Sequence, residues 1–452
     1  MLLFEETDVK TLSKGAMAAI GVAVVGVAVL AGGYIASMAA YDTLIAKAQS
    51  SAEAELNNLL KAQEIADTPV KVQIVERNYG LLKHKLALNI TSDENKISIP
   101  FTATICYAGF DYDFDLTHAK INGEYAVKEL ELNTLTSLTG TGHTSLIAGT
   151  TRFDIGTSFL NDDTGLKYLA NYGLPYHKDN GKVLTDPTVD DIKADIGYRP
   201  EGNASLVLEF GSDEQVKVSF EADNITTEIL SVSDLRFFSD GHGISAVKSF
   251  GESNISAGKL FVLDYDPLVF NQVALKLDSS RVSTKGNFDW KYELKAERFL
   301  SAKDLNISGT LQGLNIKLFN NPELFTNTVS YLEQNPLTLS IDKGSNYSFT
   351  IPTRVNNYAP VVGHDVNFAF AGQSKLSLAE GVWGPEPSLV GQYHVSFDQD
   401  VSKLQTGIFA SWPELFSYFV VKNDRSEATL DFNGLSQGNI DLKINGQEFP
   451  IF

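Results

Sequence analysis

The pattern of hydrophobic and polar positions changes twice along this chain of 452 residues. From Gly15 to Ala40 the residues are uncharged and mostly apolar. From residue 41 to residue 68 apolar positions recur at helical spacing, and beyond Pro69 they alternate with polar ones. These three patterns predict a membrane-spanning helix, a helical stalk and a β-rich body, in that order.

The uncharged run predicts a transmembrane helix over residues 15–40, because about 20 apolar residues suffice to cross a bilayer core. Lys10 and Lys14 precede the run and the next cation is Lys47, so the positive-inside rule keeps residues 1–14 in the cytoplasm and exports the remainder. The alternative is a signal peptide cleaved near residues 37–39. The run is longer than the apolar core of a signal peptide, about 7–15 residues, and this favours the anchor.

Small residues recur every fourth position within this helix, at Ala28, Gly32, Ala36 and Ala40. Such a seam lets two membrane helices approach closely, although an Ala- and Gly-rich span also produces this spacing by chance.

The stalk over residues 41–68 is rich in strong helix formers. Its stripe at helical spacing, here called the stalk stripe, consists of Ile45, Ala48, Ala52, Leu56, Leu59 and Gln63. The stripe fits packing against the body and association with other copies equally well.

Strict alternation beyond Pro69 predicts strands with one dry and one wet face, as in antiparallel sheets. We expect about twenty strands and a mainly β fold, an extended antiparallel sheet with a few short helices. The alternating segments include 110–116, 216–220, 290–294 and 440–444. The expected turns are Asn122-Gly123, Asn180-Gly181, Asn433-Gly434 and Asn445-Gly446.

The loop-rich stretch 239–243 is the expected boundary between two β-rich halves, 69–240 and 241–452. Helices are expected near 321–334, after Asn321-Pro322, and near 411–421, after a capping box from Ser411 to Glu414. Asp163 is expected to cap another short helix. Residues 186–197 fit either a helix or a strand.

The chain carries 36 basic and 56 acidic residues, a net charge of −20. Nucleic acid is therefore not an expected partner, because its recognition needs a basic footprint. Cys106 is the only cysteine, so the chain forms no internal disulfide.

No motif predicts a catalytic residue, a cofactor site or a metal site, so the chain is not expected to be an enzyme. No two of the seven histidines lie within five residues of each other, which excludes the common zinc spacings. Asp111, Asp113 and Asp115 share one face of a predicted strand, too spread out to surround a calcium ion, and are read as a solvated face. The stretch 140–143, Gly-Thr-Gly-His, lacks the helix start of a phosphate site and is predicted to be a turn.

Two segments resemble a known family. One is the strand 70–74, the aromatic-glycine turn 78–82 and the strand 85–88; the other is the turn 433–434, the strand 438–444 and the turn 445–446. This arrangement resembles the YdgA-like envelope proteins of Gram-negative bacteria, a family of unknown function. The resemblance implies a single-pass inner-membrane anchor and a periplasmic β-rich domain, and it implies no catalytic residues.

Three functions remain as hypotheses. The favoured one is a membrane-anchored periplasmic non-catalytic β scaffold that self-assembles into an oligomer, for instance through sheet edges, or binds other envelope proteins. The second is a module that binds lipid or another hydrophobic ligand on the dry face of a curved sheet. The third is a hydrolase of envelope polymers whose site the sequence does not reveal.

Overall fold

The computed structural model of the protein describes only part of the chain. The described residues are 50, 53, 57, 71–79, 83–91, 96–106, 109–125, 135–145, 148–171, 176–177, 183–211, 215–242, 250–262, 268–279, 287–300, 302–315, 331–333, 335–353, 362–381, 384–404, 413–435 and 440–449. The expected transmembrane helix, with its seam of small residues, lies outside them. Within them, no helix is long and apolar enough to span a bilayer. Three stalk residues are described, Ser50, Glu53 and Asn57, and all three are helical.

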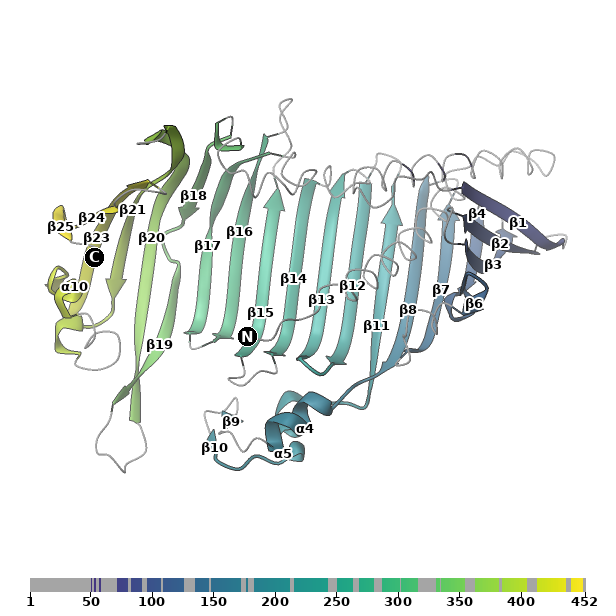
Figure 1. Cartoon of the computed structure of the whole chain (residues 1–452), viewed down its shortest axis with the longest axis horizontal. Coiled ribbons are helices and arrows are strands. Elements are labelled where there is room, and N and C mark those ends of the chain that lie inside the picture. The colour runs from purple at the N-terminus through teal and green to yellow at the C-terminus, as the bar shows by residue number, and fades with distance from the viewer. Residues whose placement is uncertain are drawn as a thin grey trace. The chain divides into compact units, whose positions relative to one another are not determined.

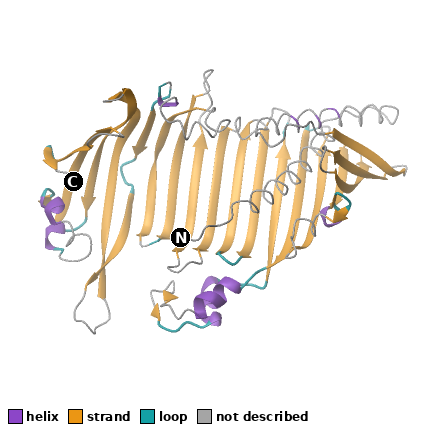
Figure 2. Ribbon diagram, in the orientation of Figure 1, coloured by secondary structure: helices purple, strands orange, loops and turns teal. Residues whose placement is uncertain are grey.

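Antiparallel strands dominate the described residues, and the helices are few and short (Figure 2). The mainly β fold expected from the alternation is therefore confirmed. The chain divides into two compact units. Unit 1 comprises Met1–Asp163, Arg199–Ile225 and His242–Ile244, and unit 2 comprises Thr164–Tyr198, Thr226–Gly241 and Ser245–Phe452.

Unit 1 is an antiparallel sheet in the order β1, β2, β3, β4, β7, β8, β11, β12, with a small hairpin of β5 and β6 beside β3. Its elements are β1 (Lys71–Tyr79), β2 (Lys83–Thr91), β3 (Lys96–Cys106), β4 (Gly109–Asp115), the 3-10 turn η2 (Leu116–His118), β5 (Lys120–Ile121), β6 (Glu124–Tyr125), β7 (Leu135–Ser145), β8 (Thr150–Leu160), β11 (Glu201–Phe210) and β12 (Gln215–Thr226).

Unit 2 continues the same hairpin-to-hairpin arrangement, and its strands β14 to β17 lie side by side (Figure 1). Both β18 and β19 lie between β17 and β20, after which β21, β23, β24 and β25 follow in order. The strands are β13 (Leu230–His242), β14 (Phe250–Val262), β15 (Leu268–Ser279), β16 (Asn287–Phe299), β17 (Ala302–Asn315), β18 (Leu337–Ile341), β19 (Asn346–Thr353), β20 (Val362–Gly381), β21 (Gly384–Phe397), β22 (Val420–Lys422), β23 (Arg425–Leu435), β24 (Ile440–Ile444) and β25 (Gln447–Phe449), with a separate hairpin of β9 (Tyr176–His177) and β10 (Val183–Leu184).

The helices of unit 2 begin where local capping residues allow. Helix α4 (Thr164–Asn171) starts directly after Asp163, as expected. The ambiguous stretch 186–197 forms helix α5 (Val189–Ile196), because Thr188 and Asp191 make a capping box and Gly197 takes the left-handed conformation that ends it. A short 3-10 turn, η3 (Val401–Lys403), follows β21.

The length predicted for the helix at 411–421 is wrong. Helix α10 covers only Pro413–Ser417, and residues 420–422 form β22, paired with β23. The β-branched residues Val420 and Val421 favour this strand over continuation of the helix. Of the helix expected near 321–334, most residues lie outside the described part, although Tyr331 and Leu332 are helical.

Two expected turns are also wrong. Residues 140–143 lie inside β7, and Asn433-Gly434 lies inside β23, where Gly434 pairs with Leu389 and Ile440. The expected boundary loop at 239–243 belongs to β13 as far as His242. The turns at Asn122-Gly123 and Asn445-Gly446 are confirmed by positive φ angles at all four residues, whereas Asn180-Gly181 lies outside the described residues.

Candidate functional site

The apolar face of the unit 1 sheet carries a buried core over β1 to β4 and becomes partly exposed over β11 and β12. Alternate residues of β1 to β4 point to it, and β8 and β11 contribute one residue each to its buried set. Leu88 is 1% exposed and Phe153 is 2% exposed. The buried residues are Val72, Ile74, Leu86, Leu88, Ile90, Ile99, Phe101, Ala103, Tyr112, Phe114, Ala119, Phe153 and Leu208.

The corresponding face of unit 2 is only half buried over β14 to β18. We call it the open apolar face and define it as Ile255, Val273, Leu275, Leu277, Tyr292, Leu294, Ile307, Leu311, Leu339 and Ile341. All except Ile255 have intermediate exposure, and Ile255 is 44% exposed. Large contiguous apolar surfaces that stay exposed on a protein mark places of contact with other molecules.

Strand register makes this face continuous. Leu275 pairs with Ile255 on one side and with Leu294 on the other, and Leu294 pairs in turn with Ile307. A second row runs from Leu277 through Tyr292. Neighbouring strands are about 4.8 Å apart, so the first row is an unbroken line of apolar side chains from β14 to β17, whereas Gly309 interrupts the second row.

Glycines opposite aromatic residues flatten this face. Tyr292 pairs with Gly309, and a Cβ at Gly309 would lie 2.6 Å from the tyrosine hydroxyl. Farther along the sheet, Phe432 pairs with Gly391, where a Cβ would lie 2.5 Å from the ring. Each ring therefore lies over a strand position without a side chain, and the surface has low relief. No local sequence pattern predicts these pairs, because the two residues of each pair come from different strands.

The polar atoms on this face are satisfied within the sheet. The Tyr292 hydroxyl donates to the Ser340 carbonyl oxygen at 3.0 Å, and the Tyr393 hydroxyl lies 2.9 Å from Ser374 Oγ. Desolvation by burial raises the pKa of Tyr292 above its ordinary value. These hydroxyls do not need an external hydrogen-bond partner, so the face can accept a purely apolar one.

Helices α4 and α5 close the end of β14 and β15. Leu166 and Ile192 are fully buried and pack in one cluster with Phe261 of β14 and Val269 of β15. Lys259 of β14 is 9% exposed, and its Nζ donates to the Asp195 carbonyl oxygen at 2.7 Å. The Asp195 carboxylate lies 3.5 Å from the same Nζ.

The opposite face of each sheet is solvated and charged. On unit 2, Lys276 Nζ lies 2.8 Å from Glu252 Oε1, and this contact holds the pKa of Glu252 below its ordinary value. Both side chains are nearly half exposed, so the pair contributes little to stability. The charged residues of this face therefore keep it in water and leave the apolar face as the distinctive surface of unit 2.

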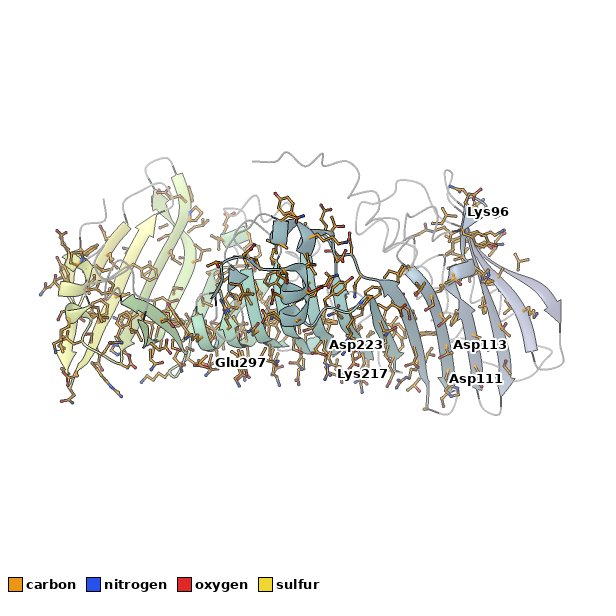
Figure 3. The ribbon with its side chains drawn as sticks, turned by 90° about the horizontal axis from the view of Figure 1, so that it is seen from below. Lys96, Asp111, Asp113, Lys217, Asp223 and Glu297 are labelled. Atoms are coloured by element: carbon orange, nitrogen blue, oxygen red, sulfur yellow. The ribbon has the colours of Figure 1, made fainter. Side chains whose placement is uncertain are left out.

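On unit 1, Asp111, Asp113 and Lys217 lie along one side of the sheet (Figure 3). Asp111 Oδ1 lies 2.8 Å from His143 Nδ1, and both side chains are 55% exposed. The reading of these aspartates as a solvated face is consistent with this exposure. Among the described residues, no group of three His, Cys, Asp or Glu side chains could hold a metal ion.

The seam predicted at Ala28, Gly32, Ala36 and Ala40 lies outside the described residues, so its role stays a prediction. Comparison of this chain with family models, with curated proteins and with solved structures finds no match. The resemblance to YdgA-like proteins likewise stays a prediction.

Proposed function

We propose that this protein is a non-catalytic scaffold, tethered to the bacterial inner membrane by its N-terminal segment, that works in the periplasm by contact. Its contact surface is the open apolar face of unit 2, and the molecules it contacts are the acyl chains of lipids. The partial exposure of that face, in contrast to the buried core over β1 to β4 of unit 1, carries the proposal.

Acyl chains fit this face better than a protein partner does. A protein interface needs about one hydrogen bond per 100–200 Å², whereas the tyrosine hydroxyls here are already satisfied within the sheet. A second copy is also disfavoured, because each chain carries a net charge of −20. Covering a partly exposed leucine with hydrocarbon would gain up to about 1 kcal/mol, and the face presents several such residues.

The test uses the full chain in vesicles that contain a phospholipid with a photoreactive group midway along one acyl chain. After illumination, lipid adducts are mapped to peptides. We expect adducts on β15, β16 and β17 in addition to any on residues 15–40. Leu275→Glu should lower the adducts on these strands at least tenfold, because it places a charge in the central row.

Ala274→Glu is the matched control, because it adds the same charge at the adjacent, exposed position on the opposite face of β15. It should leave the adducts unchanged. Circular dichroism of both variants checks that the sheet is intact. Adducts confined to residues 15–40 contradict the proposal. The proposal is also contradicted if no lipid adduct forms and Leu275→Glu loses self-association. The face would then be an interface between copies.

A further inference from the structure

A row of basic and amide side chains crosses the unit 2 sheet beyond one end of the open apolar face. Lys259 of β14 pairs with Asn271 of β15, Asn271 pairs with Arg298 of β16, and Arg298 pairs with Lys303 of β17. Residues that face each other directly across antiparallel strands point to the same side of a sheet. We call these four residues the basic row.

The basic row lies on the same side of the sheet as the open apolar face. Side chains alternate along a strand, so Tyr292, Leu294, Ala296 and Arg298 of β16 share one side. None of residues 292–298, all of which are described, has a positive φ that would disturb this alternation. Arg298 therefore lies four residues beyond Leu294, about 13 Å along the strand, on the side that carries the apolar rows.

The three cations of the basic row differ in their partners. Lys259 Nζ lies 3.5 Å from the Asp195 carboxylate of α5, and Lys303 Nζ lies 3.2 Å from Asp365 Oδ1. Arg298 is partly exposed, and its Nε donates to a backbone carbonyl oxygen at 3.2 Å. It forms no ion pair with any residue that the structure describes. The two terminal nitrogens of its guanidinium thus offer four N–H donors to an external acceptor.

The spacing between Arg298 and the far apolar row matches an amphiphilic molecule. Arg298 and Tyr292 are six residues apart on β16, about 20 Å. One acyl chain of a bilayer spans about 15 Å, half of the hydrocarbon core. A planar guanidinium binds phosphate through two parallel hydrogen bonds. A phosphate at Arg298 would therefore leave its acyl chain lying over the apolar rows.

The negative charge of the whole chain does not prevent this contact. Its net charge of −20 acts at long range, and salt screens exposed charges beyond about 8 Å at physiological ionic strength. A hydrogen-bonded guanidinium–phosphate pair acts at contact distance, where screening is weak.

We propose that Arg298 binds the phosphate of a phospholipid whose acyl chain lies along β16 on the open apolar face. The carbonyl end of the chain lies beside Ala296 and the methyl end points toward Tyr292. This inference rests on the proposed function and adds to it the headgroup chemistry and the direction of the bound chain.

Two photoreactive lipids with identical acyl chains test the role of the phosphate. Phosphatidylglycerol carries the phosphate and diacylglycerol lacks it, and each is added in trace amount to phosphatidylcholine vesicles that hold the full chain. We expect about tenfold more adducts on β15, β16 and β17 from phosphatidylglycerol than from diacylglycerol, because a charge-assisted hydrogen bond adds to the apolar contact. Arg298→Gln should lower the phosphatidylglycerol adducts to the diacylglycerol level and leave the diacylglycerol adducts unchanged.

Lys295→Gln is the matched control, because it removes one positive charge from the opposite, solvated side of the same strand, where Lys295 is 57% exposed. It should leave both kinds of adduct unchanged. Circular dichroism of both variants checks that the sheet is intact.

The position of the photoreactive group tests the direction of the chain. In phosphatidylglycerol, a group next to the acyl carbonyl should label the part of β16 around Ala296, and a group near the methyl end should label the part around Tyr292. The same distribution for both positions, or the reverse order, overturns the inference.

The outcomes separate this inference from the proposed function. Equal adducts on β15 to β17 from both lipids, unaffected by Arg298→Gln, overturn the role of Arg298 and leave acyl binding in place. No adducts on these strands from either lipid overturn the proposed function, and the inference with it.

Discussion

The two units bury the same kind of sheet face to different extents. In unit 1, Leu88 pairs with Ile74 and Ile99 and is 1% exposed. In unit 2, Leu275 pairs with Ile255 and Leu294 and remains partly exposed. Both leucines have two aliphatic cross-strand neighbours, so neighbours within the sheet do not account for the difference. The burial of a sheet face therefore depends on what packs against it and not on its cross-strand pairs alone.

Both units nevertheless share one packing device. In unit 1, Gly142 pairs with Tyr112 and Phe153, and a Cβ there would lie 2.6 Å from the Phe153 ring. In unit 2, Gly391 pairs with Phe432, and the Tyr393 and Phe432 rings are parallel within 6° at 5.9 Å. Rings that lie flat over glycines bring whatever packs on them close to the backbone. Packing of a ring over a glycine therefore occurs both in a buried core and on a partly exposed face.

The largest expected effect contrasts the two leucines. Leu88→Ala should destabilise the protein by about 2–5 kcal/mol, because it leaves a cavity in a closed core. Leu275→Ala should cost about 1 kcal/mol, because water already reaches that side chain. Urea unfolding followed by circular dichroism measures both. Equal costs would contradict the contrast, since Leu275 would then be as fully packed as Leu88.

The sequence predicted the strands well and the faces only in part. Alternation at 110–116 and 290–294 corresponds to β4 and β16, because one side of each strand is apolar and the other polar. Alternation identifies the apolar side of β15 as readily as that of β2, but it contains nothing about a second layer. The candidate site could therefore not be predicted, since exposure depends on residues distant in the chain.

The predicted turn at residues 140–143 is wrong for a related reason. Residues 140–143 look like a turn when read locally, yet they form the middle of β7. Gly142 is needed there because the Tyr112 and Phe153 rings occupy the space that a side chain would fill. That requirement comes from neighbouring strands, so no local pattern reports it.

The second prediction contrasts glycines. Gly142→Ala should destabilise the protein by about 1–3 kcal/mol, because the new methyl group meets rings that a closed core prevents from moving. Gly391→Ala should cost a similar amount, because the new methyl group meets Ser374 Cβ at 2.8 Å and the Gln373 carbonyl oxygen at 3.0 Å as well as the Phe432 ring. Gly156→Ala on β8 is the control: a Cβ there meets nothing within 4 Å, so the change should stay within about 0.5 kcal/mol.

Chemical denaturation of the three glycine variants, with the same spectroscopic signal, gives this ranking directly. A cost of Gly142→Ala no larger than that of Gly156→Ala would contradict the prediction, since the Tyr112 and Phe153 rings would then be free to move.

The smallest expected effect concerns two tyrosines of unit 2 that differ in how far they are buried. Tyr292 lies on the open face, whereas Tyr331 is 5% exposed in a cluster with Phe288, Leu314 and Leu332. Burial raises the pKa of both above the ordinary value of 10.0. The folded chain therefore keeps a proton that the unfolded chain loses. The stability that this contributes is complete below about pH 10 and is lost as the pH rises through the folded-state pKa values.

Bound acyl chains should separate these tyrosines. They would remove water from Tyr292 and raise its pKa further, while Tyr331 is already enclosed and should not respond. Alkaline titration of tyrosinate absorbance, taken as the difference between the native chain and Tyr292→Phe, reports the first group with and without lipid. The same difference for Tyr331→Phe reports the second. A lipid-induced shift of equal size at both positions would mean that lipid changes unit 2 as a whole. A shift at Tyr292 alone requires contact at the open apolar face.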